Sequence, residues 1–218
     1  MRPGLFIITG SNGAGKSTIG ATYLPPKIQQ DYTVFDGDKL MLQKRKELLK
    51  TIRSVKEAGK MADEWVFKSF TQQVKSAIGA KDHFAYEGHF RNRIAINTPR
   101  KFKRNGYVLN LIFMGLTDPE LSELRVIDRA RHGGHNVPIH HIRFNFYGNL
   151  AMLNENFKLF DDVLVIDTSK NLQHKILLHL IGKKISFYTP LKELPEWFTK
   201  FLPKLTELIK AEEGLSFD

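Results

Sequence analysis

Cysteine is absent from this chain of 218 residues. Without thiols the protein can form no disulfide, no zinc–thiolate site and no cysteine nucleophile. Long apolar runs are also missing, since no stretch approaches the roughly 20 residues that a membrane-spanning helix needs. The first apolar segment, Leu5 to Ile8, is too short for a signal peptide and is followed at once by a glycine-rich loop. We therefore expect a cytoplasmic protein that does not enter a membrane.

Acidic residues are in deficit. The chain carries 33 Lys and Arg against 23 Asp and Glu, for a formal net charge of +10. Such a charge attracts polyanions, and nucleic acid is one candidate partner. The basic residues are scattered, however, and form neither a cluster nor a known nucleic-acid-binding module. We therefore favour cations that serve a phosphate-handling site, with nucleic-acid binding as the disfavoured alternative.

Short apolar runs alternate with segments of helical periodicity. The runs that predict strands are 5–8, 32–35, 83–86, 108–114 and 163–166. The segments that predict helices are 17–24, 39–80, 98–105, 118–131 and 139–157. Thr98-Pro99 and Asp118-Pro119 are typical helix starts. This alternation predicts an α/β fold of the P-loop NTPase and kinase type, a doubly wound, mostly parallel sheet flanked by helices.

The last part of the chain has a different pattern. Two apolar runs surround Gly182 within 175–188 and predict a β-hairpin, and 194–211 predicts a helix. No linker or repeat separates these elements from the rest. We expect a core at 1–170, with a lid at about 125–143, and a hairpin-plus-helix extension at 171–218 that packs on the core.

A P-loop follows the first predicted strand. Its glycines let backbone N–H groups surround an anion, Lys16 reaches the β- and γ-phosphates, and Ser17 ligates Mg²⁺. A buried strand before it and a helix after it are the context that this motif requires. The pattern therefore predicts a site for ATP or GTP with Mg²⁺, made of Gly10, Ser11, Asn12, Gly13, Ala14, Gly15, Lys16, Ser17 and Thr18.

The P-loop alone does not define the reaction. Hydrolysing motors and switches usually carry a further apolar strand that ends in Asp, and no such strand is obvious here. The absence favours a phosphotransferase that acts on a hydroxyl of a small molecule, such as a sugar, a nucleoside or an antibiotic. A regulatory or nucleic-acid-associated ATPase with no small-molecule acceptor is the alternative.

Further motifs make the chain resemble the zeta-toxin-like P-loop kinases. They are Phe35-Asp36-Gly37-Asp38, Phe84-Ala85-Tyr86-Glu87, Arg125-Val126 with Arg129, and Gly133-Gly134-His135-Asn136-Val137-Pro138 leading to Ile142-Arg143. The resemblance implies phosphorylation of a nucleotide sugar such as UDP-N-acetylglucosamine on a sugar hydroxyl, and it allows an antitoxin protein as a partner. The chain departs from the family pattern at Asp36-Gly37, where the family commonly has Asn-Ala, and at Gly88-His89, where it commonly has Thr-Thr; the acceptor is expected to bind at both places.

The resemblance also suggests roles for individual carboxylates. Asp38 is the candidate for the group that accepts or orients the acceptor hydroxyl proton. Its alternative role is the N-cap of the helix that starts near Lys39. Asp36 could share the acceptor site. Glu87, at the end of a strand, would hold the acceptor or a Mg²⁺-bound water, or would simply be a solvated loop residue.

Arginines flank the glycine-rich turn at 133–134. Arg125 and Arg129 share one helical face and are candidates for lid residues that neutralise charge on the transferred phosphoryl group. Arg143 is assigned to the same catalytic group, and His135 is expected to contact the substrate from the lid. Residues 167–169, after the last strand of the core, are expected near the nucleotide base.

Overall fold

The computed structural model describes residues 2–132, 137–171 and 173–215 of the chain. Its centre is a 7-stranded sheet. The strands are β1 (Gly4–Gly10), β2 (Phe35–Asp36), β3 (Phe84–Glu87), β4 (Val108–Gly115), β5 (Asp162–Lys170), β6 (Gln173–Ile181) and β7 (Lys184–Tyr188). They lie in the order β2-β3-β1-β4-β5-β6-β7.

Neighbouring strands from β2 to β5 are parallel, and β6 and β7 add an antiparallel edge. The interior strand β1 is buried along its whole length, as its continuous apolar sequence predicts. The carboxyl ends of β1, β2 and β3 meet at one edge of the sheet, so the loops that follow them share one crevice.

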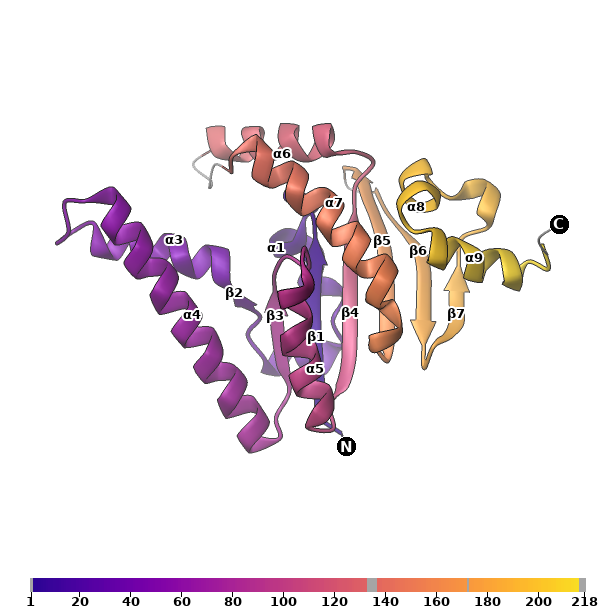
Figure 1. Ribbon diagram of the computed structural model, residues 1–218, viewed down its shortest axis with the longest axis horizontal. Coiled ribbons are helices and arrows are strands. Elements are labelled where there is room, and N and C mark those ends of the chain that lie inside the picture. The colour runs from indigo at the N-terminus through magenta and orange to yellow at the C-terminus, as the bar shows by residue number, and fades with distance from the viewer. Residues whose placement is uncertain (1, 133–136, 172, 216–218) are drawn as a thin grey trace.

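Helices cover both faces of this sheet (Figure 1), with α5 and α7 in front of it and α1 behind it. The α-helices are α1 (Lys16–Ile19), α2 (Pro26–Asp31), α3 (Gly37–Leu48), α4 (Val55–Ala80), α5 (Asn97–Arg104), α6 (Pro119–Arg131), α7 (Ile139–Asn156), α8 (Glu196–Phe201) and α9 (Pro203–Glu212). Short 3₁₀ turns lie at Gly20–Tyr23, Arg93–Ile96, Phe157–Leu159 and Leu191–Glu193. The predicted doubly wound, mostly parallel α/β fold is confirmed.

Several predicted boundaries were wrong. The predicted helix 39–80 is two helices, because the Ser54 hydroxyl caps α4 by accepting a hydrogen bond from the backbone N–H of Glu57. Thr98 is not an N-cap, since a 3₁₀ turn runs directly into α5 and Ile96 occupies the cap position. The predicted helix 194–211 divides at Pro203, which has no N–H to donate and instead starts α9.

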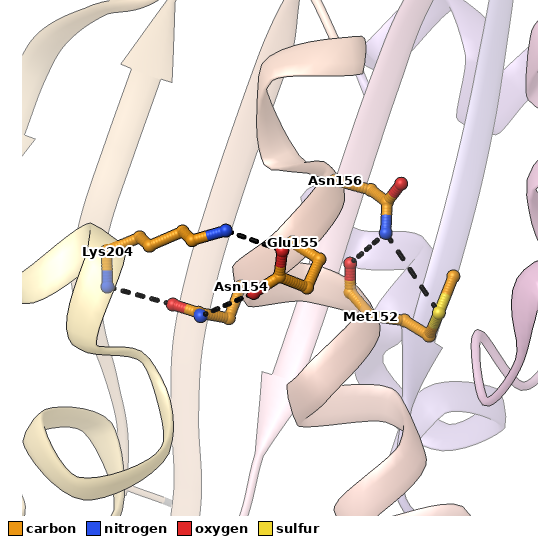
Figure 2. Close-up of polar contacts among 5 residues, drawn as sticks. All are labelled: Met152, Asn154, Glu155, Asn156 and Lys204. Atoms are coloured by element: carbon orange, nitrogen blue, oxygen red, sulfur yellow. Dashed lines mark hydrogen bonds and ion pairs between the residues drawn. The ribbon is translucent and has the colours of Figure 1, made fainter.

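The C-terminal extension continues the sheet. Strand β6 pairs antiparallel with β5, and the buried Trp197 packs against the backbone of β4. A Cβ atom on Gly115 would lie 2.2 Å from the indole ring of Trp197, so this contact requires glycine. Figure 2 shows the contact of the extension with α7, where the side-chain oxygen of Asn154 accepts a hydrogen bond from the backbone N–H of Lys204 at 2.9 Å.

In the part of the chain that the structure describes, no helix has both the length and the apolarity that a membrane crossing requires.

Candidate active site

The P-loop turns from β1 into α1 through glycines with positive φ angles. Gly10 has φ 144°, and a Cβ atom there would lie 2.2 Å from the carbonyl oxygen of Met114. Gly13 has φ 72°, and its Cβ would lie 2.8 Å from Arg125. Backbone conformation and close packing therefore both demand glycine at these positions, and the loop can present N–H groups rather than side chains to a ligand.

Lys16 lies inside the loop. Its ammonium group donates hydrogen bonds to the backbone carbonyls of Gly10 at 3.1 Å and Ser11 at 2.9 Å, and the residue is 8% exposed. Burial lowers the pKa of Lys16, while the negative charges of Glu87 and Asp38 act in the opposite direction. The lysine is thus held where an anion bound in the loop would meet its charge.

A cavity of about 470 Å³ opens beside the loop. It brings together most of the residues that the sequence pointed to, although they come from separate strands and helices. Lys39 and Leu42, which the motifs did not single out, complete its wall. The lining residues predicted from the sequence are Asn12, Gly13, Gly15, Lys16, Ser17, Thr18, Asp36, Asp38, Glu87, Arg125 and Arg129.

The two aspartates at the start of α3 have different roles. Asp36 is the N-cap, because its Oδ1 accepts a hydrogen bond from the backbone N–H of Lys39 at 3.0 Å. Asp38 lies in the first helical turn and lines the cavity. The alternative interpretation of Asp38 as the helix cap is therefore wrong, and its exposed carboxylate remains available to a ligand.

Glu87 and Ser17 form an oxygen-donor pair at the edge of the cavity. The hydroxyl of Ser17 donates to Oε1 of Glu87 at 2.7 Å. Burial raises the pKa of Glu87, and the positive charge of Lys16 and the bond from Ser17 partly oppose that rise. A hydroxyl and a carboxylate are ligands that suit Mg²⁺, which usually takes its other ligands from phosphates and water.

Arg125 joins the P-loop to the segment that follows β5. Its guanidinium donates to the carbonyls of Gly13 at 3.2 Å, Thr168 at 2.9 Å and Ser169 at 2.8 Å, and to the side-chain oxygen of Asn171 at 3.0 Å. These bonds occupy most of its donors. Arg125 therefore holds two walls of the site together.

The other predicted arginines are placed differently. Arg129 lines the cavity, and its charge is one of those that lower the pKa of Lys16. Arg143 is not among the residues that line this cavity. Its guanidinium is 2.7 Å from Glu123 and 3.0 Å from Glu120, so it ties α7 to α6. His135 and the predicted turn at 133–134 lie outside the described residues.

A second cavity, of about 700 Å³, lies on the other side of the loop. It shares Gly13, Gly15, Thr18 and Arg125 with the first cavity. Its wall also includes the apolar side chains of Ile19, Leu121 and Leu124, the segment 168–171, and the polar residues Asp128 and His174. The P-loop thus separates two spaces, and the second is the one next to residues 167–169, where the nucleotide base was expected.

His89 packs beneath the loop. Its Nδ1 lies 3.2 Å from the carbonyl of Gly10, and its Nε2 lies 3.5 Å from the side-chain nitrogen of Asn12. Burial lowers the pKa of His89 well below its ordinary value. The neutral ring with its proton on Nδ1 fits both contacts, because Nδ1–H then donates to the carbonyl.

Sequence motifs missed a group of buried polar residues around the loop. Ser122 donates its hydroxyl hydrogen to the backbone carbonyl of Asn12, and Asn145 donates to the side-chain oxygen of the same residue at 2.7 Å. One signal was present in the sequence, because Asn145 and Asn149 are four residues apart within the apolar stripe of a predicted helix. A polar side chain on a buried face needs a partner.

The P-loop between β1 and α1 lines a cavity that also contains the Ser17–Glu87 pair and Asp38. Together with the family pattern, this fold identifies the chain as a P-loop kinase. The chain belongs to the zeta toxin family, whose pattern it matches over residues 1–179.

Solved structures share the fold at low sequence identity. A chain of the AvrRxo1-ORF1:AvrRxo1-ORF2 complex with sulphate ions has a TM-score of 0.68 and 17% identity, with coverage of 100% of this chain and 72% of that one. A chain of the same complex solved with ATP has a TM-score of 0.66 and 15% identity, with coverage of 92% of this chain and 64% of that one. A chain of the PezAT toxin-antitoxin system of Streptococcus pneumoniae has a TM-score of 0.56 and 22% identity, with coverage of 80% of this chain and 73% of that one. No curated protein matches the sequence.

Proposed function

We propose that this protein transfers the γ-phosphoryl group of ATP to a hydroxyl group of a small molecule, and that the acceptor is a nucleotide sugar such as UDP-N-acetylglucosamine. One observation carries the proposal. A single cavity contains both the phosphate-binding Lys16 and the carboxylate of Asp38, which no helix cap requires. Phosphoryl transfer needs a donor held by cations and a carboxylate near the attacking oxygen, and this cavity supplies both.

The donor triphosphate would lie on the P-loop. Backbone N–H groups of the loop and the N-terminal end of α1 favour anions there. The base would enter the second cavity, past Arg125, where Ile19 and Leu121 offer apolar contact. In support, a structural neighbour has been solved with ATP. GTP is the alternative donor, and direct comparison of the two nucleotides tests the choice.

The acceptor would lie on the side of Asp36, Asp38, Lys39 and Leu42. Asp38 would accept the proton of the attacking hydroxyl or orient that hydroxyl toward the γ-phosphorus. Lys39 lines the same wall and would offer its positive charge to a phosphate of a nucleotide sugar. The family resemblance supplies the nucleotide sugar as the specific candidate.

Mg²⁺ would be held by Ser17 and Glu87, and when bound it supplies positive charge that neutralises the phosphate oxygens during transfer. Glu87 would hold the ion through its carboxylate and would keep the Ser17 hydroxyl in place. Arg129 faces the same cavity and would add a further positive charge on the transferred group. Arg125 would act by positioning the loop.

We also propose a protein antitoxin as a partner. The support is the zeta toxin family itself, together with the solved PezAT toxin-antitoxin system, whose fold this chain shares. Co-expression with the gene product encoded next to this chain, followed by purification of a stoichiometric complex that has lost ATP consumption, would test the partner.

The test of the reaction is an ATP-consumption screen across nucleotide sugars, nucleosides and aminoglycosides, with products identified by mass spectrometry. We expect the parent protein to add one phosphoryl group to UDP-N-acetylglucosamine, and the Asp38→Asn variant to do so more slowly by about a hundredfold or more. ATP hydrolysis that no acceptor stimulates, combined with salt-sensitive binding of RNA or DNA, would instead support an ATPase associated with nucleic acid.

A further inference from the structure

Two buried asparagines project from α7 toward the carboxyl edge of the sheet. Asn145 is 2% exposed and Asn149 is 0% exposed. The two residues lie one helical turn apart, on the face of α7 that packs on β1. A buried carboxamide must be hydrogen-bonded to avoid a large desolvation cost, so its partners indicate what it holds in place.

Asn149 joins the end of β1 to the segment after β3. Its Oδ1 accepts a hydrogen bond from the hydroxyl of Thr9 at 3.0 Å and another from the backbone N–H of Phe90 at 2.6 Å. Its Nδ2 donates to the backbone carbonyl of Asn145 at 2.6 Å. Thr9 immediately precedes the P-loop, and Phe90 follows Glu87 by three residues.

Asn145 makes the same type of connection one turn earlier. Its Nδ2 donates to Oδ1 of Asn12, which lines the first cavity, at 2.7 Å. Its Oδ1 accepts a hydrogen bond from the guanidinium of Arg91 at 2.8 Å. The carboxamide therefore contacts the P-loop with one end and the segment after β3 with the other.

Close packing holds α7 against the second of these segments. A Cβ atom on Gly148 would lie 2.6 Å from the carbonyl oxygen of Arg91, so the helix can approach this closely only with glycine at that position. The backbone N–H of Gly88 also donates to the carbonyl of Ile8 at 3.1 Å. Segment 88–91 is thus bound to both β1 and α7, directly after the carboxylate of Glu87.

We propose that Asn145 and Asn149 are positioning residues that hold the P-loop and the Glu87 end of β3 in one rigid frame. The inference rests on the proposed function, because it assigns the frame to the alignment of bound ATP with the Ser17–Glu87 pair. Neither asparagine lines either of the two cavities beside the P-loop. Each would act through a residue that does, with Asn145 acting through Asn12 and Asn149 through the ends of β1 and β3.

A buried asparagine can also serve the fold alone, without acting on the P-loop. Helix α7 contains such a residue, which serves as a matched control. Asn154 is also a buried asparagine of this helix, 7% exposed. Figure 2 shows its side-chain oxygen accepting the backbone N–H of Lys204 in the C-terminal extension, while Lys204 also pairs with Glu155. Loss of this contact would weaken the docking of the extension and leave the P-loop untouched.

The discriminating variant is Asn145→Asp. Aspartate keeps an acceptor for Arg91, now as a charge-assisted hydrogen bond, but it cannot donate to Asn12. A carboxylate oxygen buried against Oδ1 of Asn12 costs stability, so ATP affinity, and not the melting temperature, is the measurement that separates the two roles. The affinity for ATP with Mg²⁺, measured by calorimetry, should fall about tenfold, the scale seen when a group that orients a ligand-binding residue is lost. Asn154→Ala should lower the melting temperature and leave that affinity unchanged.

A double-mutant cycle with Asn12→Ala completes the test. Once the Asn12 side chain is gone, Asn145→Asp should weaken ATP binding no further. Parental ATP affinity in Asn145→Asp, or effects of the two substitutions that simply add, would overturn the proposal. If Asn145→Asp does not fold, Asn145→Ala removes the hydrogen bond to Asn12 without adding a charge or a new donor, and the same cycle of ATP affinities judges it.

These measurements use ATP binding and need no acceptor. A parent protein that binds ATP but phosphorylates no hydroxyl compound would contradict the proposed function and still allow the asparagine cycle to be completed. A parent that phosphorylates its acceptor while Asn145→Asp behaves like Asn154→Ala would contradict only the positioning role.

Discussion

The hydroxyl oxygen of Ser17 lies 2.7 Å from Oε1 of Glu87, although 70 positions separate the two residues. They meet because β1 and β3 are neighbouring parallel strands, with Ile8 in register with Glu87. The loop after β1 and the last residue of β3 therefore reach the same edge of the sheet. This contact places Glu87 in the wall of the cavity beside the P-loop.

Glu87→Gln should weaken binding of ATP in the presence of Mg²⁺ and have little effect in the presence of EDTA. Burial raises the pKa of Glu87 above its ordinary value, so its carboxylate is protonated at a higher pH than usual. Binding that needs the charged form should therefore fall as the pH drops through this raised pKa. The ratio of parent to Glu87→Gln affinity, measured over a pH series, cancels the titration of ATP itself. A ratio that does not change with pH would contradict the role of Glu87.

Asp38→Asn should slow phosphoryl transfer by about a hundredfold or more while ATP affinity changes little, because a positioned general base contributes at this scale. Asparagine keeps the shape of the side chain and loses the charge. Steady-state kinetics with saturating ATP would measure the effect. Transfer at the parental rate would remove Asp38 from the mechanism.

Asp36→Ala is the matched control for Asp38. Asp36 caps α3 through the backbone N–H of Lys39, and loss of a cap costs about 1 kcal/mol of stability. We therefore expect a lower free energy of unfolding in urea for Asp36→Ala and none of that loss for Asp38→Asn. The reverse order of stabilities would show that the cap had been assigned to the wrong aspartate.

Lys16→Ala should abolish the rise in melting temperature that ATP with Mg²⁺ produces, since the charge clamp on the phosphates is lost. The melting temperature without nucleotide should be retained, because the buried ammonium carries a desolvation cost that alanine lacks. Differential scanning fluorimetry with and without ATP measures both. Stabilisation by ATP equal to that of the parent would contradict the P-loop assignment.

Alanine substitutions of Arg125, Arg129 and Arg143 should affect different kinetic parameters. Arg129→Ala should lower kcat with little change in KM for ATP, as expected of a charge that acts in the transition state. Arg125→Ala should raise KM for ATP, because it releases the P-loop from the segment of Thr168 and Ser169. Arg143→Ala should retain both parameters, since its partners are Glu120 and Glu123. A large loss of kcat in Arg143→Ala would restore it to the catalytic group.

Much of this protein could be predicted from local sequence. The apolar run before the P-loop, the glycines within it and the hydroxyl after Lys16 describe a strand, an anion-binding turn and a helix start, each of which depends on residues close in the chain. The alternation of strands and helices was enough to predict a parallel α/β sheet. Even the hairpin around Gly182 followed from two apolar runs and a turn.

Tertiary structure decided which of the candidate side chains share a site. From the sequence, Asp38 was the candidate for the helix cap, and only the path of the chain out of β2 assigns the cap to Asp36. Arg125 and Arg143 both fit a lid motif, yet one is bound to the carbonyls of Thr168 and Ser169 and the other to Glu120 and Glu123. Hydrogen-bond partners that lie 20 to 44 positions away leave no periodic trace in the sequence.

The sequence by itself determined the phosphate-binding loop, because a backbone turn with positive φ angles depends on glycines at fixed local positions. Only the folded sheet determined what surrounds that loop. Glu87 reaches Ser17 through strand order, and Asn145 and Asn149 reach Asn12 and Thr9 because α7 packs across β1. A hydrogen bond forms only when donor and acceptor lie about 3 Å apart. Whether residues far apart in the sequence reach that distance depends on how their helices and strands pack in the core.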